Sequence, residues 1–139
     1  MKAAEMARIY ARAFAEERAW TTDEIGSLVT ANGAIIVTLD QGFAIGRVTL
    51  DEAEVITIAV DPDAQRRGHG NRLLQKVEER AAAKGARVLF LEVAADNTAA
   101  LRLYGSRSFE QVGIRPHYYP RQNGISADAL VMQKLLDRT

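Results

Sequence analysis

Apolar residues recur along the chain with two different spacings, and each spacing predicts one kind of element. A spacing of three to four residues predicts a helix over 2–19, a short helix with its N-cap at Thr22, and helices over about 70–84 and 97–107. Alternating patterns and short apolar runs predict strands at 34–39, 43–50, 54–60, 87–93, 110–119 and 127–136. Strands come first, and strands then alternate with helices, which favours one mixed α/β sheet with helices on both faces.

The segment 54–60 is apolar on both faces, so we expect it in the centre of the sheet. The helix over 70–84 has an inner apolar stripe, formed by Leu73, Leu74, Val77 and Ala81. Its polar positions are expected to face water, and they are Glu78, Glu79, Arg80 and Lys84. A length of 139 residues favours a single domain over 1–139.

Composition and charge exclude several function classes. The 18 basic and 18 acidic residues balance, so no net charge favours nucleic acid or a membrane surface. The absence of cysteine excludes disulfides, thiolate metal sites and a cysteine nucleophile, and the two histidines occur in unrelated contexts. No segment has the pattern of a signal peptide or a transmembrane span, so we expect a soluble cytoplasmic domain without a metal site.

The stretch "DPDAQRRGHGNRLL" (61–74) places two arginines and two glycines directly in front of a helix. The first backbone N–H groups of a helix lack internal partners, and the helix dipole adds partial positive charge there. Gly68 and Gly70 let the backbone approach a ligand closely, while Arg66 and Arg67 add donors. We therefore expect the turn to hold an anion, most naturally a phosphate. The alternative is a basic loop that only connects a strand to a helix.

Two familiar phosphate loops do not fit this turn. A P-loop needs Lys and then Ser or Thr after its last glycine, whereas Asn71 and Arg72 follow Gly70. A dinucleotide fingerprint needs a third glycine where Leu73 stands. The expected ligand therefore carries a pyrophosphate that needs no metal.

The segment 60–70 resembles the Q/R-x-x-G-x-G/A motif of the GNAT superfamily of acyl-CoA-dependent N-acyltransferases. The segment 89–109 is similar to that family's next strand and helix, with the pattern L-E-V-x-x-x-N-x-x-A-x-x-L-Y-x-x-x-G-F. The segments 115–120 and 128–133 resemble the closing part of its RimI branch, the ribosomal-protein-alanine N-acetyltransferases. The resemblance extends from about Ala34 to the end of the chain, and it implies the GNAT fold, whose mixed sheet is mostly antiparallel (α+β type).

The resemblance implies acetyl-CoA as co-substrate and assigns residues to it. In the family, the strand that matches Ile58, Ala59 and Val60 binds the pantetheine arm through its backbone. The turn that wraps the pyrophosphate corresponds to Arg66, Arg67, Gly68, His69, Gly70 and Asn71. A family asparagine that contacts the cofactor arm corresponds to Asn97, whose other interpretation is a plain helix N-cap.

Glu92 lies inside "VLFLEVA", an otherwise apolar strand. A carboxylate there is costly unless it is paired or opens onto a site. The resemblance implies that Glu92 accepts the proton of the acceptor amine. The alternative is a glutamate at a strand end in an ion pair with Arg102 or Arg115.

Tyr104 lies seven residues after Asn97, so both share one face of the helix over 97–107. The resemblance implies that Tyr104 protonates the leaving thiolate. Its other interpretation is a core aromatic residue, because Leu101 and Ser108 share its face.

Three aromatic residues, Trp20, Tyr118 and Tyr119, resemble residues that line the acceptor slot in the branch. Core packing is the alternative for each of them. His69 and His117 are interpreted as solvated or packed loop residues and not as catalytic groups.

The chain departs from the family pattern in two places. Ser108 stands where the family has glycine, so the end of the preceding helix is expected to differ. The family's first edge strand is expected to be shortened or missing, because the sequence starts almost at the first helix.

The residues and the resemblance together predict transfer of acetyl from acetyl-CoA to a protein N-terminal amine by direct attack in a ternary complex. The acceptor expected from the branch is an N-terminal alanine of a ribosomal protein. The alternatives are the same fold acting on a lysine side chain or a small-molecule amine, and a non-catalytic acyl-CoA-binding module. The sequence does not indicate the oligomeric state.

Overall fold

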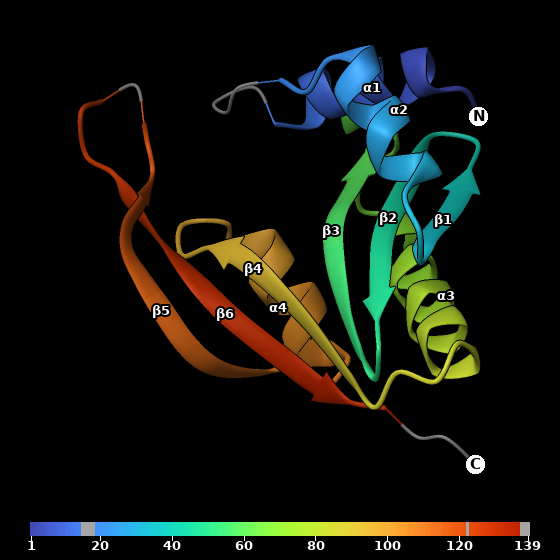
Figure 1. The fold of residues 1–139 in the computed structure, drawn as a ribbon. Helices are drawn as coiled ribbons and strands as arrows, with labels where there is room; N and C mark the ends of the chain where they lie inside the picture. Colours follow the sequence, from blue (N-terminus) through green and yellow to red (C-terminus); the bar gives the residue numbers. More distant parts are fainter. Residues whose placement is uncertain (15–18, 122, 137–139) are drawn as a thin grey trace.

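A six-stranded sheet organises the molecule (Figure 1). The computed structural model describes residues 1–14, 19–121 and 123–136. In chain order, the strands are β1 (Ala34–Leu39), β2 (Gly42–Thr49), β3 (Glu52–Val60), β4 (Val88–Ala94), β5 (Glu110–Tyr119) and β6 (Ala127–Leu135). Their spatial order is β1-β2-β3-β4-β6-β5, and every neighbouring pair is antiparallel except β3 and β4. The mixed, mostly antiparallel sheet agrees with the sequence prediction.

Helices cover both faces of this sheet, as the sequence predicted. The helices are α1 (Ala3–Ala13), α2 (Thr22–Thr30), α3 (His69–Ala83) and α4 (Thr98–Ser106), and a short 3-10 turn spans Pro62–Ala64. The helices α1 and α2 pack on one face around Phe43 and Ile45, while α3 and α4 pack on the other around Leu73 and Leu89 (Figure 1). No helix in the described ranges is long and apolar enough to cross a membrane.

The central strand β3 has a bulge close to the point where it leaves β4. Val55 and Thr57 face consecutive residues of β2, so Ile56 between them is an extra residue, and such a bulge bends a strand. Within the described chain, β3 and β4 pair only over Glu52–Glu54 and Val88–Phe90. The two strands then diverge towards their C-terminal ends, as Figure 1 shows, and the bulge accounts for the bend.

Two predicted helix boundaries were wrong. The first helix ends at Ala13 and not at 19, and the part of the prediction on 15–18 lies outside the described residues. The N-cap of α2 is Thr21 and not Thr22, because the Thr21 side chain accepts from the backbone of Glu24 while the Glu24 carboxylate accepts from the Thr21 backbone. This reciprocal pair satisfies two otherwise unpaired N–H groups and fixes the start of the helix.

Glu78 was expected to face water but is 8% exposed. Its carboxylate accepts hydrogen bonds from Nε and Nη2 of Arg107 at 2.6 and 3.1 Å, and from Nζ of Lys134 at 2.6 Å. A buried charge is tolerated when it is paired and hydrogen-bonded in this way. The helical pattern could not reveal this burial, because the two partners come from the end of α4 and from β6.

Candidate functional site

A cleft of about 950 Å³ opens where β3 and β4 diverge. Its walls come from the end of α1, the middle of β3, the second half of β4, the face of α4 between its N-cap and Tyr104, and the end of β5. Three of the residues that line it have a carboxylate or guanidinium side chain, namely Glu54, Glu92 and Arg115. The cleft therefore brings together groups that lie more than 60 residues apart in sequence.

Glu92 lies on β4 and lines this cleft with its side chain 26% exposed. Leu91 and Val93, on either side of it, point into the core beneath α3 and α4, so the alternation of the strand turns Glu92 towards the opposite face. Its Oε1 atom lies 3.2 Å from Nη2 of Arg115. Of the two ion-pair partners considered from the sequence, the structure selects Arg115, and the pair opens onto the cleft.

Tyr104 also lines the cleft, and it is one of the buried residues of the core beside α4. Its ring lies 5.8 Å from that of Phe109, between centroids. Burial, with a smaller contribution from nearby Tyr119, raises the pKa of Tyr104 to about 12. The phenol therefore keeps its proton at neutral pH, as a proton donor must. The side chain is a core aromatic, as one interpretation of the sequence expected, and it also lines the cleft.

Asn97 is the N-cap of α4 and a lining residue of the cleft at the same time. Its Oδ1 accepts a hydrogen bond from the backbone N–H of Ala100 at 3.1 Å. The cap uses the side-chain oxygen, so the amide nitrogen is the group of Asn97 that can contact a ligand.

The basic turn before α3 has the backbone expected of an anion cradle. Arg66 and Gly68 both have positive φ, at 65° and 80°, and α3 begins directly after them at His69. Both arginines of the turn are exposed. The N-terminal amides of α3 therefore point out of a tight, positively charged turn, which is the arrangement that binds phosphate groups.

The first turn of α3 packs directly against α4. A Cβ placed on Gly70 would lie 3.1 Å from a methyl group of Leu103, so glycine permits this approach. Asn71 accepts a hydrogen bond at its Oδ1 from Nη1 of Arg107 at 3.1 Å. The cradle and the helix that carries Tyr104 are therefore joined at two points. No local pattern in the sequence predicts the contact between Asn71 and Arg107, because Asn71 begins one helix and Arg107 ends another.

Three residues of β3, Ile58 to Val60, are expected to bind the pantetheine arm through their backbone. Their side chains point to different parts of the molecule. Ile58 lines the cleft, while Ala59 is buried against α1 and α2. Val60 packs at the edge of the opposite core. All three lie beyond the part of β3 that pairs with β4, so their backbone faces a gap in the sheet on that side.

Aromatic residues line the cleft, and all three that the sequence singled out are among them. Trp20 stacks on Tyr10 with ring centroids 4.8 Å apart and planes 7° apart. Tyr118 meets Tyr119 edge-on at 5.1 Å. Tyr10 also lines the cleft, and the sequence does not distinguish it from the other apolar residues of the first helix.

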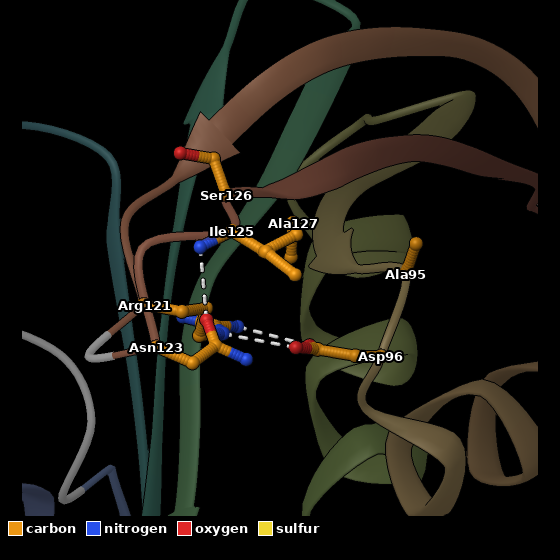
Figure 2. A pocket seen from close by; sticks show the side chains of 7 residues that line it. All are labelled: Ala95, Asp96, Arg121, Asn123, Ile125, Ser126 and Ala127. Atoms are coloured by element: carbon orange, nitrogen blue, oxygen red, sulfur yellow. Dashed lines mark hydrogen bonds and ion pairs between the residues drawn. The ribbon is translucent and has the colours of Figure 1, made fainter.

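The hairpin that carries Tyr118 and Tyr119 is tied to the turn before α4. Arg121 donates from Nε and Nη2 to the two carboxylate oxygens of Asp96, each at 2.9 Å, and its guanidinium lies 5.6 Å from the Tyr119 ring centroid. Figure 2 shows this pair at the edge of a second, smaller pocket of about 640 Å³, where Asn123 Oδ1 also accepts from the Ile125 backbone. The hydrogen bonds to Arg121 lower the pKa of Asp96, so this contact persists at neutral pH.

Comparison with known proteins shows the family of this chain. The model of the acetyltransferase (GNAT) family matches residues 4–109. The chain is 48% identical over 90 residues to the [Ribosomal protein bS18]-alanine N-acetyltransferase of Salmonella typhimurium, which covers 65% of this chain and 60% of that protein. It is 37% identical over 114 residues to the protein of the same name from Haemophilus ducreyi, with 77% and 79% covered.

Among solved structures, the fold is similar to the ribosomal-protein-S18-alanine N-acetyltransferase from Escherichia coli. The TM-score is 0.88 at 34% identity, and 99% of this chain and 89% of that chain are covered. The matched region spans about three fifths of the length of the Salmonella relative. The structural likeness to the Escherichia coli protein extends over almost the whole of this chain.

Proposed function

Because this chain belongs to the acetyltransferase (GNAT) family, we propose that it transfers an acetyl group from acetyl-CoA to the N-terminal α-amine of a protein. The relatives described above are named as alanine N-acetyltransferases of ribosomal protein bS18 (S18). These names support an N-terminal alanine of a ribosomal protein as the acceptor. The same acceptor supports a cytoplasmic location. The observation that carries the proposal is that Glu92 and Tyr104 line one cleft at the gap between β3 and β4.

The chain offers acetyl-CoA two matching features. The turn from Arg66 to Asn71 combines helix amides, glycine and two exposed arginines, which suits a pyrophosphate. The free side of β3 from Ile58 to Val60 can hydrogen-bond the amide groups of a pantetheine arm, as a neighbouring strand would. Bound acetyl-CoA would supply the acetyl group as a thioester, and Asn97 would contact its arm.

Two side chains would handle the protons of the reaction. Glu92 accepts the proton that the acceptor nitrogen loses, and its partial exposure to the cleft lets it pass that proton to water. Tyr104 holds a proton at Oη that it can donate to the departing sulfur. An N-terminal amine has a pKa of about 7.7–8.0, so a carboxylate is a sufficient base for it.

The aromatic walls of the cleft suit a peptide acceptor. Trp20, Tyr118 and Tyr119 present flat, amphipathic surfaces to it, and such residues can contact backbone and side chains of an extended peptide. They would position the first residues of the acceptor with the amine directed at Glu92.

Mass spectrometry of a peptide panel incubated with acetyl-CoA tests the proposal. The panel varies the N-terminal residue and includes N-terminally blocked peptides with one internal lysine. We expect acetylation of free N-terminal alanine. If acetyl-CoA binds and no peptide is modified, the peptide acceptor is wrong, and small amines or a non-catalytic binding role take its place.

Variants of the two proton-handling residues separate turnover from binding. Glu92→Gln and Tyr104→Phe should each lower kcat by about 10²–10⁴-fold while the Kd for acetyl-CoA stays unchanged. Arg102→Gln, at an exposed position of α4, is the matched control and should leave both values unchanged. Full activity of Glu92→Gln would contradict the assigned mechanism.

A further inference from the structure

Arg115 holds a permanent positive charge against the proposed proton acceptor. Its Nη2 lies 3.2 Å from Oε1 of Glu92, and its guanidinium carbon lies 5.3 Å from the ring centroid of Tyr118. All three residues line the cleft. A guanidinium does not lose its proton at any working pH of a protein. A cation therefore already occupies the place where the acceptor amine must deliver its proton.

The sheet itself builds this contact across an intervening strand. Glu92 is in register with Val131 of β6, and Arg115 is in register with Ala129 of the same strand. Side chains of directly opposed residues lie on the same face, so Glu92 and Arg115 share one face with β6 between them. Ala129 is completely buried and has only a methyl side chain, which leaves room for the longer arginine to cross above it. The position of Arg115 thus follows from strand order and register.

The cleft is lined by a second carboxylate, that of Glu54, which is in register with Arg47 of β2. Glu54 on β3 is in register with Phe90 of β4, two residues before Glu92, so both carboxylates face the same side of the sheet. An incoming ammonium is attracted to both of them. At Glu92, however, it meets the guanidinium at close range, and two cations at one carboxylate repel each other.

We propose that Arg115 is a specificity-determining residue that keeps charged ammonium groups away from Glu92 and so selects acceptors whose amine is already neutral. The inference rests on the proposed acetyl transfer and names its substrate class: N-terminal α-amines in preference to lysine ε-amines. At pH 7.5 roughly a third of α-amino groups are neutral, compared with roughly one in a thousand lysine side chains. Exclusion of the charged form therefore discriminates between them before any peptide contact is made.

The proton accounting agrees with entry of a neutral amine. The acceptor nitrogen forms a bond to the carbonyl carbon of the acetyl group, and the bond from that carbon to sulfur breaks. The nitrogen loses one proton, which Glu92 receives, and the sulfur gains one from Tyr104. Exchange with water then returns both side chains to their starting states, so no further reactant is needed.

Competition between two matched peptides tests the role of Arg115 at pH 7.5. One peptide has a free N-terminal alanine and no lysine, and the other has the same sequence with a blocked N-terminus and one lysine. The quantity measured is the ratio of their kcat/KM values with acetyl-CoA. We expect Arg115→Gln to lower this ratio by about tenfold, chiefly through a lower KM for the lysine peptide. Arg115→Lys keeps the charge and should keep the ratio within about threefold of the wild-type value.

Arg102→Gln removes an exposed arginine of α4 and should leave the ratio unchanged. If the wild-type protein prefers the α-amine but Arg115→Gln leaves the ratio of kcat/KM values unchanged, the role of Arg115 is wrong and the proposed function stands. A wild-type protein that acetylates both peptides equally well would overturn both. If Arg115→Gln raised KM for both peptides equally, Arg115 would be a general peptide contact and the selection of neutral amines would be wrong.

Discussion

Tyr104 and Phe109 are joined through both backbone and side chain at the end of α4. The N–H of Phe109 donates to the carbonyl of Tyr104 at 3.0 Å, and their ring centroids lie 5.8 Å apart. The N–H of Ser108 donates to the carbonyl of Gly105 at 3.1 Å. These two bonds and the apolar contact form a Schellman motif, which closes the helix one turn after the proposed acid. The motif thereby helps to fix the position of Tyr104.

Replacement of Ser108 by glycine should stabilise the protein. Ser108 occupies the C′ position of this motif with φ of 70°, a conformation that costs a residue with a Cβ roughly 1–2 kcal/mol. Glycine removes that strain but loses more entropy on folding, so Ser108→Gly should raise the free energy of unfolding by about 0.5–1 kcal/mol. Urea unfolding measures the change. Ser106→Gly, at the last residue of α4, is the control and should destabilise the protein by about 0.5 kcal/mol.

Tyr104 should make the stability of the protein fall at alkaline pH. Burial raises the pKa of Tyr104 from 10 to about 12 in the folded state. A group whose pKa is raised on folding contributes stability that is complete below its unfolded pKa and is lost as pH rises through the folded value. Between pH 9 and pH 11 the loss due to Tyr104 amounts to about 1 kcal/mol.

Urea unfolding of the wild type and of Tyr104→Phe at both pH values measures this contribution. The variant lacks the titrating phenol, so its stability should fall by about 1 kcal/mol less than that of the wild type. Parallel losses in the two proteins would show that Tyr104 ionises as readily in the folded state as in the unfolded one.

The exposed arginine Arg66 should contribute to the binding of CoA through its phosphates. Arg66→Gln should raise the Kd for CoA by about fivefold, as expected for one partly screened charge-assisted contact. Pantetheine lacks the phosphates, so its affinity should not change. Lys76→Gln, at an exposed position farther along α3, serves as the control. An equal loss of affinity for CoA and pantetheine would place Arg66 elsewhere in the site.

Glu78 and Arg107 should be energetically coupled, so that their contributions to the free energy of unfolding are not additive. Arg107→Met removes two of the hydrogen bonds that Glu78 accepts and leaves Lys134 as its partner, which should cost about 2–3 kcal/mol in urea unfolding. The double variant Glu78→Met with Arg107→Met should regain part of that loss, because no buried carboxylate remains. Purely additive losses would contradict the coupling.

The order and kind of elements could be read from the sequence, because apolar spacing reports which side of each segment is covered. The strands at 34–39 and 54–60 and the helix at about 70–84 lie within a few residues of their observed places. The prediction was wrong where local chemistry or distant partners decide. Thr21 rather than Thr22 caps α2 through a reciprocal bond, and Glu78 is buried because Arg107 and Lys134 reach it.

For the site, the sequence by itself determined the types of residue and their places along the chain. It pointed to Glu92 as a carboxylate in an apolar strand, to Tyr104 on a helix face, and to the basic turn before α3. Only the tertiary structure decided that Arg115 and not Arg102 pairs with Glu92. That choice depends on β6 lying between β4 and β5 and on the register of three strands, which arise from pairings between distant segments. Local sequence patterns report the burial of a segment, but they do not report which distant segment lies beside it.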